Sequence, residues 1–175
     1  MEKIFEYFKD IEVVSIELLI CNNKKAYALT KARELNIRSL LINKENFYNS
    51  SFVSNEILKI GPSLIVLAGF LWKIPKTFVE KFSNKIINIH PALLPKYGGK
   101  GMYGINIHNA VIEKKEVKSG ITIHYVNENY DEGEILFQKS ININKGETAK
   151  ELSKRILALE HEYYPKIIHK TLKGE

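Results

Sequence analysis

The chain has 175 residues, a length typical of one domain, and carries a formal net charge of +6 with lysines spread along it. Its single cysteine, Cys21, excludes an internal disulfide framework, argues against a cysteine-based metal cluster and fits a reducing cytoplasm. No apolar run approaches the roughly 20 residues of a membrane span, and no basic stripe with interleaved aromatic residues indicates nucleic-acid binding. We therefore expect a cytoplasmic protein that binds neither membranes nor nucleic acid. Its positive charge is typical of a solvated, lysine-rich surface, and a second interpretation is a field that attracts anionic small substrates.

The first part of the chain shows apolar spacing typical of alternating helices and strands. The expected elements are a helix over 2–9, a strand buried on both faces over 11–20, a helix over 24–35, a short strand over 39–42, a helix over 54–60 capped by Ser54, and a central strand over 64–68. Such alternation favours a parallel sheet with helices packed against it.

The second part of the chain continues this pattern and then changes it. The expected elements are a helix from Pro75 to about Phe82, a strand over 85–89, a glycine-rich loop over 96–104, a helix over 105–114, strands over 120–126 and 135–143, and a final helix with the capping box Thr148 and Glu151. The last two strands are close enough in sequence to pair antiparallel. The prediction is one α/β domain over residues 1–175, with an open, mostly parallel, Rossmann-like sheet, helices on both faces and antiparallel strands at its C-terminal end.

The segment from Asn88 to Pro95 is the most informative part of the sequence. Asn88 and His90 stand two positions apart at the end of an apolar run, so in a strand they face the same side. Open α/β sheets bind ligands at the carboxyl ends of their strands. A strand end followed by a proline-rich turn is the alternative interpretation of the same residues.

Asp131 lies in a polar loop between the last two predicted strands, and the topology can bring that loop to the edge that bears His90. A carboxylate next to an imidazole raises the imidazole pKa and fixes its orientation. The amide, the imidazolium and the carboxylate together suit acyl transfer through a tetrahedral intermediate. No serine or cysteine is evidently paired with a base, so direct transfer between two bound substrates is favoured over a covalent intermediate.

Several segments together resemble the signature of the folate-dependent formyltransferases, and within that family the chain looks most like the glycinamide ribonucleotide formyltransferases. The matching segments, in chain order, are Val66-Leu67-Ala68-Gly69-Phe70, the run from Asn88 to Tyr97, the run from Ser119 to Val126, Asp131-Glu132-Gly133, and the run from Leu159 to Pro165. The resemblance extends over nearly the whole chain.

The resemblance implies a catalytic trio of Asn88, His90 and Asp131, no metal, and transfer of a formyl group from 10-formyltetrahydrofolate to the amine of 5'-phosphoribosylglycinamide in purine biosynthesis. It implies a monomer or homodimer with small-molecule substrates. The residues implied to contact the folate are Leu71, Trp72, Lys73, Ile74, Asn88, Asn127, Glu128, Tyr130 and Asp131. Those implied to contact the acceptor are Gly69 and Glu160, and an exposed helix glutamate is the plain alternative for Glu160.

Two departures from the family pattern accompany the resemblance. The segment Gly98–Gly104 replaces the commoner Pro-Gly and His-Thr pattern, and it is expected to reshape the acceptor site. The family's opening strand and its Gly-Ser-Asn-type phosphate loop are not found in the sequence, which leads to the hypothesis of an N-terminally shortened enzyme that binds its acceptor weakly. The alternatives are a formyltransferase for another amine, such as a nucleotide sugar or methionyl-tRNA, and an inactive folate-binding remnant.

Overall fold

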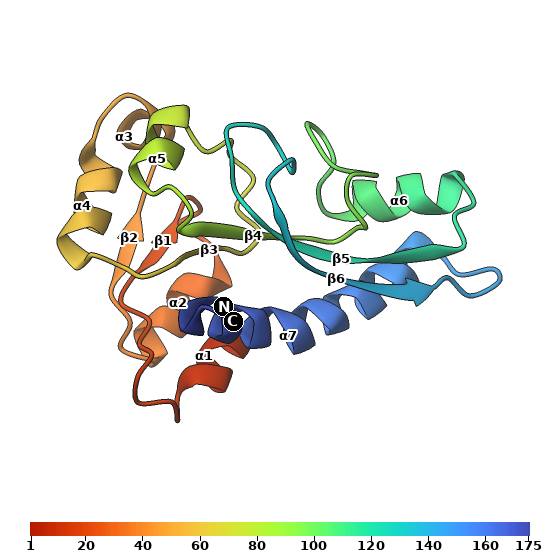
Figure 1. Cartoon of the computed structure of the whole chain (residues 1–175), viewed down its shortest axis with the longest axis horizontal. Helices are drawn as coiled ribbons and strands as arrows, with labels where there is room; N and C mark the ends of the chain where they lie inside the picture. Colours follow the sequence, from red (N-terminus) through yellow and green to blue (C-terminus); the bar gives the residue numbers. More distant parts are fainter. The chain divides into compact units, whose positions relative to one another are not determined.

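The computed structural model describes all residues, 1–175, and their contacts divide the chain into two compact units, residues 1–63 and 64–175. Each unit combines helices with strands, which confirms the predicted α/β class (Figure 1). The assignment of residues 1–175 to one domain stays a prediction. None of the helices combines the length and the apolar character needed to cross a membrane.

The first unit contains four helices and a two-stranded parallel sheet. Its elements are α1 (Glu2–Phe8), β1 (Leu19–Cys21), α2 (Tyr27–Glu34), β2 (Ser39–Leu41), α3 (Lys44–Tyr48) and α4 (Phe52–Ile60). Its apolar core is small, and its buried hydrophobic residues are Phe8, Ala32, Ile37, Ile42, Phe47, Val53 and Ile57.

The structure corrects two predictions in this unit and adds one helix that was not predicted. The buried strand over 11–20 is wrong: only Leu19–Cys21 is a strand, because β2 offers a partner for three residues, and Val13 is 88% exposed. Ser54 does not cap a helix, since α4 begins at Phe52 and the Ser54 hydroxyl donates a hydrogen bond to the Ser51 carbonyl at 3.0 Å. The short helix α3 was not predicted, although Asn43 caps its first turn.

The second unit contains a four-stranded sheet in the order β3-β4-β5-β6 with three helices. Its elements are β3 (Ile65–Leu67), α5 (Lys76–Lys81), β4 (Ile86–His90), α6 (Ile105–Glu113), β5 (Lys118–Tyr125), β6 (Ile135–Asn142) and α7 (Ala149–Lys173). β3 and β4 are parallel, whereas β4–β5 and β5–β6 are antiparallel, as predicted for the C-terminal strands (Figure 1). The capping box of Thr148 and Glu151 at the start of α7 is confirmed.

The apolar run over 64–68 predicts a central strand. In the structure, β3 lies at an edge of its sheet instead. It pairs with β4 alone, and the parallel pairs of the chain are therefore divided between a two-stranded and a four-stranded sheet. All three residues of β3 are only partly buried, because no strand of the chain pairs with its other edge.

The core of the second unit holds β4 and β5 in place for the candidate site. Its central cluster comes from the turn after β4, from α6, from β5 and from α7, and consists of Ala92, Ile107, Val111, Ile121, Leu152 and Ile156. The buried hydroxyl of Tyr164 on α7 donates to the carbonyl oxygens of Leu67 and Ile87, at 2.8 and 3.3 Å. These bonds attach α7 to the backbone of β3 and β4, so the strand that carries Asn88 and His90 is fixed by packing and by backbone contacts.

Candidate active site

The candidate site is built on facing residues of β4 and β5. Asn88 lies directly opposite His124, and His90 lies opposite Thr122. Because alternate residues of a strand share a face, the four side chains point to the same side of the sheet. His90 and His124 are 4% and 2% exposed, so both imidazoles are removed from bulk water.

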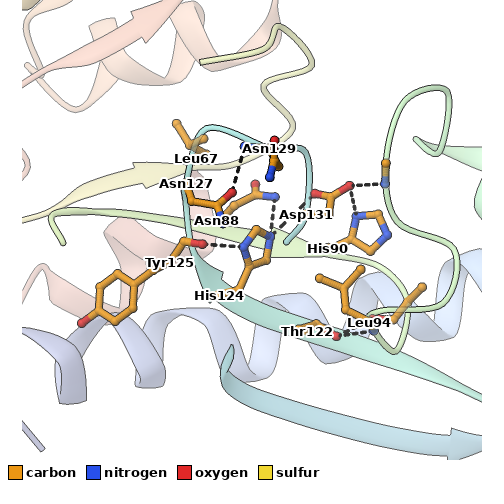
Figure 2. Close-up of polar contacts among 12 residues, drawn as sticks. Leu67, Asn88, His90, Leu94, Thr122, His124, Tyr125, Asn127, Asn129 and Asp131 are labelled. Carbon is orange, nitrogen blue, oxygen red and sulfur yellow. Dashed lines mark hydrogen bonds and ion pairs between the residues drawn. The ribbon is translucent and has the colours of Figure 1, made fainter. Parts of the chain in front are cut away.

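The carboxylate of Asp131 lies between the two imidazoles (Figure 2). Its Oδ2 is 3.6 Å from His90 Nδ1, and its Oδ1 is 3.7 Å from His124 Nε2. Asn88 reaches the same cluster, with its Nδ2 3.3 Å from His124 Nε2. The structure thus brings together the three residues that the sequence predicts as catalytic, Asn88, His90 and Asp131.

The glycine-rich loop after β4 contacts both members of the His90–Asp131 pair. The Tyr97 carbonyl lies 2.8 Å from His90 Nε2, and the Gly99 N–H donates to Asp131 Oδ2 at 2.9 Å. Tyr97 and Asp131 both have left-handed backbone conformations, with φ of 59° and 56°. A side-chain-bearing residue adopts this conformation at a cost of order 1 kcal/mol, which the surrounding contacts offset.

The turn that follows His90 is held by Thr122. The Thr122 hydroxyl donates to the Ala92 carbonyl at 2.7 Å and accepts from the Leu94 N–H at 3.0 Å. Gln138 on β6 donates to both the Thr122 hydroxyl and the Leu94 carbonyl. These bonds satisfy the buried polar groups of a segment that belongs to neither a helix nor a strand, and they anchor the start of the glycine-rich loop.

The tautomer of His90 follows from its backbone contact. A carbonyl oxygen only accepts hydrogen bonds, so Nε2 carries the proton that it donates to Tyr97, and Nδ1 faces Asp131. Burial lowers the pKa of His90 below its ordinary value, and the charge of Asp131 offsets only part of this effect. The expectation that the carboxylate raises the pKa of His90 above its ordinary value is therefore wrong in its net direction, because burial outweighs the attraction.

The pKa of Asp131 is shifted in the opposite direction to that expected from burial alone. Burial by itself would raise its pKa, but the polar contacts of the carboxylate, which include His90 and the Gly99 N–H, outweigh burial and hold the pKa below its ordinary value. Asp131 is therefore a carboxylate at neutral pH. Next to it, neutral His90 can accept a proton at Nδ1, and the resulting imidazolium is stabilised by the negative charge.

Replacing Asp131 with asparagine is expected to lower the pKa of His90 further, because the substitution removes the one negative charge that favours the imidazolium. Asparagine keeps an oxygen that can accept from the Gly99 N–H, so the loop contact survives. An NMR titration of the His90 ring in both proteins measures the effect. An equal or higher pKa in the variant would show that the two groups are not coupled.

Apart from Asn88 on β4, the residues expected to contact the folate lie in two segments that meet in the structure. The Lys73 ammonium lies 5.9 Å from the centre of the Tyr130 ring, and Lys76 pairs with Glu128 at 3.2 Å. Leu71 is 55% exposed, Trp72 packs edge-on against Phe70, and Ile74 is buried. The remaining predicted contact, Asn127, accepts the N–H of Asn129 at 2.9 Å, which shapes the loop next to Asp131 (Figure 2).

The two residues expected to contact the acceptor are not joined to the trio by hydrogen bonds. Gly69 follows β3 in a left-handed conformation, with φ of 69°, and is exposed. Glu160 lies on α7 one turn before Tyr164, and burial raises its pKa to about 7. It is therefore a partly buried acid and not the exposed helix glutamate of the plain interpretation.

Replacing Glu160 with glutamine is expected to flatten the pH dependence of stability. Because the pKa rises from 4.5 to about 7 on folding, the folded chain binds more protons between these values, and the free energy of unfolding falls as pH rises through this window. Above it, the variant should be more stable than the wild type by up to about 3 kcal/mol. Urea unfolding at several pH values measures the difference. A wild-type curve that is flat, or that rises across the window, would contradict the shift.

Sequence reasoning did not assign three of the groups that build the site. These are the His124 imidazole, the Tyr97 carbonyl and the Gly99 N–H. The period-two spacing of Thr122 and His124 was a usable signal for one face of β5. The register that places His124 opposite Asn88 depends on the β4–β5 pairing, and backbone groups carry no sequence signal.

The segment Gly98–Gly104, which differs from the family pattern, is closely packed at its first residue. A Cβ at Gly98 would lie 2.7 Å from Leu94 Cδ2 and 3.2 Å from the Cβ of Asp131. Close approach to the trio therefore favours glycine here. No group of three or more His, Cys, Asp and Glu side chains is arranged to hold a metal ion.

The chain belongs to the formyl transferase family: the model of the family described as "Formyl transferase" matches residues 2–168. Among curated proteins, it is 41% identical over 158 residues to the chloroplastic phosphoribosylglycinamide formyltransferase of Arabidopsis thaliana, covering 87% of this chain and 54% of that protein. It is 32% identical over 157 residues to the phosphoribosylglycinamide formyltransferase of Haemophilus influenzae, covering 87% of this chain and 72% of that protein. The chain thus spans about half the length of the plant relative.

Solved structures of similar proteins share the fold. The phosphoribosylglycinamide formyltransferase of Anaplasma phagocytophilum superposes with a TM-score of 0.89 at 31% identity, over 99% of this chain and 80% of that one. The phosphoribosylglycinamide formyltransferase of Coxiella burnetii superposes with a TM-score of 0.86 at 34% identity, over 99% of this chain and 81% of that one. These matches confirm both the predicted fold and the predicted resemblance.

Proposed function

We propose that the chain transfers a formyl group from 10-formyltetrahydrofolate to the amine of 5'-phosphoribosylglycinamide, a step of purine biosynthesis. One observation carries the proposal: Asp131 Oδ2 lies 3.6 Å from His90 Nδ1, and His90 shares its face of β4 with Asn88. The names of the relatives and of the solved structures supply the acceptor and the transferred formyl group, and the folate donor is what the family resemblance implies.

In the proposed reaction the acceptor amine attacks the formyl carbon, and a tetrahedral intermediate forms. The Asn88 amide donates a hydrogen bond to the formyl oxygen as that atom gains negative charge, which lowers the barrier most where the charge is largest. The bond from carbon to the acceptor nitrogen forms, and the bond from carbon to folate N10 breaks. No enzyme nucleophile is needed, because both substrates react directly.

The His90–Asp131 pair moves the proton in this proposal. The attacking amine must lose a proton, and the departing folate nitrogen must gain one. Neutral His90 accepts the proton at Nδ1, and Asp131 stabilises the imidazolium until the proton passes to N10. A lowered pKa suits this role, because the imidazolium then passes its proton on more readily.

The folate is proposed to lie against the 71–74 segment, the 127–131 loop and Asn88. The proposed contacts are Leu71, Trp72, Lys73, Ile74, Asn88, Asn127, Glu128, Tyr130 and Asp131. The contact between Lys73 and Tyr130 supports this, because it joins the two segments directly. Gly69 and Glu160 are proposed to contact the acceptor. The proposal also assigns residues 1–175 to one cytoplasmic formyltransferase domain.

Transfer to competing acceptors tests the proposed function. The chain is incubated with 10-formyltetrahydrofolate and, in parallel, with 5'-phosphoribosylglycinamide, an amino sugar nucleotide and methionyl-tRNA, and the release of tetrahydrofolate is followed by absorbance. The proposal predicts the largest kcat/KM for 5'-phosphoribosylglycinamide. A larger value for either other acceptor, or release only by hydrolysis, would overturn it.

A further inference from the structure

His124 is a buried imidazole whose two ring nitrogens have different partners. Its Nδ1 lies 2.7 Å from the carbonyl oxygen of Tyr125, the next residue in β5 (Figure 2). Since a carbonyl only accepts, this nitrogen carries a proton. In the neutral ring Nε2 then bears the lone pair and can only accept.

The partner of Nε2 is the side-chain amide of Asn88. The Asn88 Nδ2 atom lies 3.3 Å from His124 Nε2, within hydrogen-bond distance, whereas Asp131 Oδ1 is farther away at 3.7 Å. An N–H of the amide therefore donates to the ring. The amide nitrogen has a second N–H, which remains for another acceptor, and the amide oxygen is turned away from the ring.

We infer that His124 is a positioning residue that fixes the orientation of the Asn88 amide through the Nδ1–H tautomer. This inference rests on the proposed function. With the nitrogen held toward His124, Asn88 presents a hydrogen-bond donor to the formyl oxygen. Without an acceptor on His124 the amide can turn over, and its oxygen would then face the developing negative charge and repel it.

The Tyr125 carbonyl sets the tautomer, and Gly133 sets the position of that carbonyl. A Cβ on Gly133 would lie 1.7 Å from the Tyr125 oxygen, so only glycine permits this close approach. The chain of contacts thus runs from Gly133 to the Tyr125 carbonyl, then to His124 and finally to Asn88. Each member restricts the next to one arrangement.

Two substitutions of His124 test the roles of its two ring nitrogens separately. Asparagine can place an N–H near the position of Nδ1 but has no acceptor at the position of Nε2. Glutamine can place an oxygen near Nε2 and thereby accept from Asn88. We expect His124→Asn to lower kcat by about 10- to 100-fold with KM for the folate little changed, and His124→Gln to recover most of that loss.

A double-mutant cycle with Asn88 distinguishes a positioning role of His124 from a packing role. In an Asn88→Ala background, His124→Asn should lower kcat by no more than about twofold, because the amide that it positions is gone. Equal losses in the Asn and Gln variants, or a loss that multiplies with that of Asn88→Ala, would overturn the inference and leave His124 a packing residue.

The nitrogen chemical shifts of the His124 ring test the inference independently of activity. In the intact wild-type chain we expect the Nδ1–H tautomer, with Nε2 unprotonated. A chain that shows this tautomer but transfers no formyl group refutes the proposed function while the arrangement of His124 and Asn88 stands. An Nε2–H tautomer, or a doubly protonated ring, in an active chain refutes the inference and leaves the proposed function intact.

Discussion

Replacing His90 with alanine is expected to lower kcat for formyl transfer by about 10²- to 10³-fold, while the dissociation constant of the formyl-folate changes by less than about threefold. The imidazole is the group that pairs with Asp131, and the segments expected to hold the folate are built by other side chains. Single-turnover kinetics and fluorescence titration with the folate measure the two quantities.

The buried position of His90 requires a control for folding, since alanine removes a side chain that is 4% exposed. Thermal unfolding should show that the variant is folded at the assay temperature. His161→Ala, which changes an exposed histidine of α7, is the matched control and should keep wild-type activity. Equal losses of binding and turnover in the His90 variant would instead indicate a structural role.

Replacing Gly133 with alanine is expected to lower the free energy of unfolding by at least about 3 kcal/mol. The new methyl group would lie 1.7 Å from the Tyr125 carbonyl oxygen and 2.7 Å from its carbon. These are backbone atoms of β5, so no side-chain rotation can relieve the clash. The loop that carries Asp131 must shift, and formyl transfer should fall with stability.

Urea unfolding of Gly133→Ala and of Glu134→Ala measures this effect. The second variant is the control, because Glu134 is the next residue along the chain and its side chain is exposed. Its backbone carbonyl, which accepts from the Tyr125 N–H at 2.8 Å, is unchanged by the substitution. A difference between the two variants below about 1 kcal/mol would show that the loop adapts without cost.

The sequence was sufficient to predict which side chains meet at the candidate site but not their backbone partners. Asn88 and His90 could be placed on one face because a strand has a period of two, and the structure confirms this. Asp131 could be placed near them because the order of strands returns its loop to the same edge. The Tyr97 carbonyl could not be predicted, because its position depends on a left-handed residue within a loop.

The same limits explain the errors in the fold. The apolar run over 11–20 has the composition of a buried strand, but a strand forms only where a neighbour offers hydrogen bonds, and β2 offers them to Leu19–Cys21. The apolar run of β3 likewise indicates a central strand, although it has one neighbour. Ser54 has the properties of a cap, but helix α4 extends two residues farther toward the N-terminus. Composition is local, whereas pairing is set by the tertiary structure.

Following a labelled formyl group tests the central claim most directly. The intact 175-residue chain is incubated with 10-formyltetrahydrofolate labelled with ¹³C in the formyl carbon and with 5'-phosphoribosylglycinamide, and the products are identified by NMR and mass spectrometry. The account predicts that the label appears on the amine of the acceptor, in a one-to-one ratio to the tetrahydrofolate released, and that His90→Ala suppresses this product. Label that stays on the folate, or that appears as formate, would contradict it.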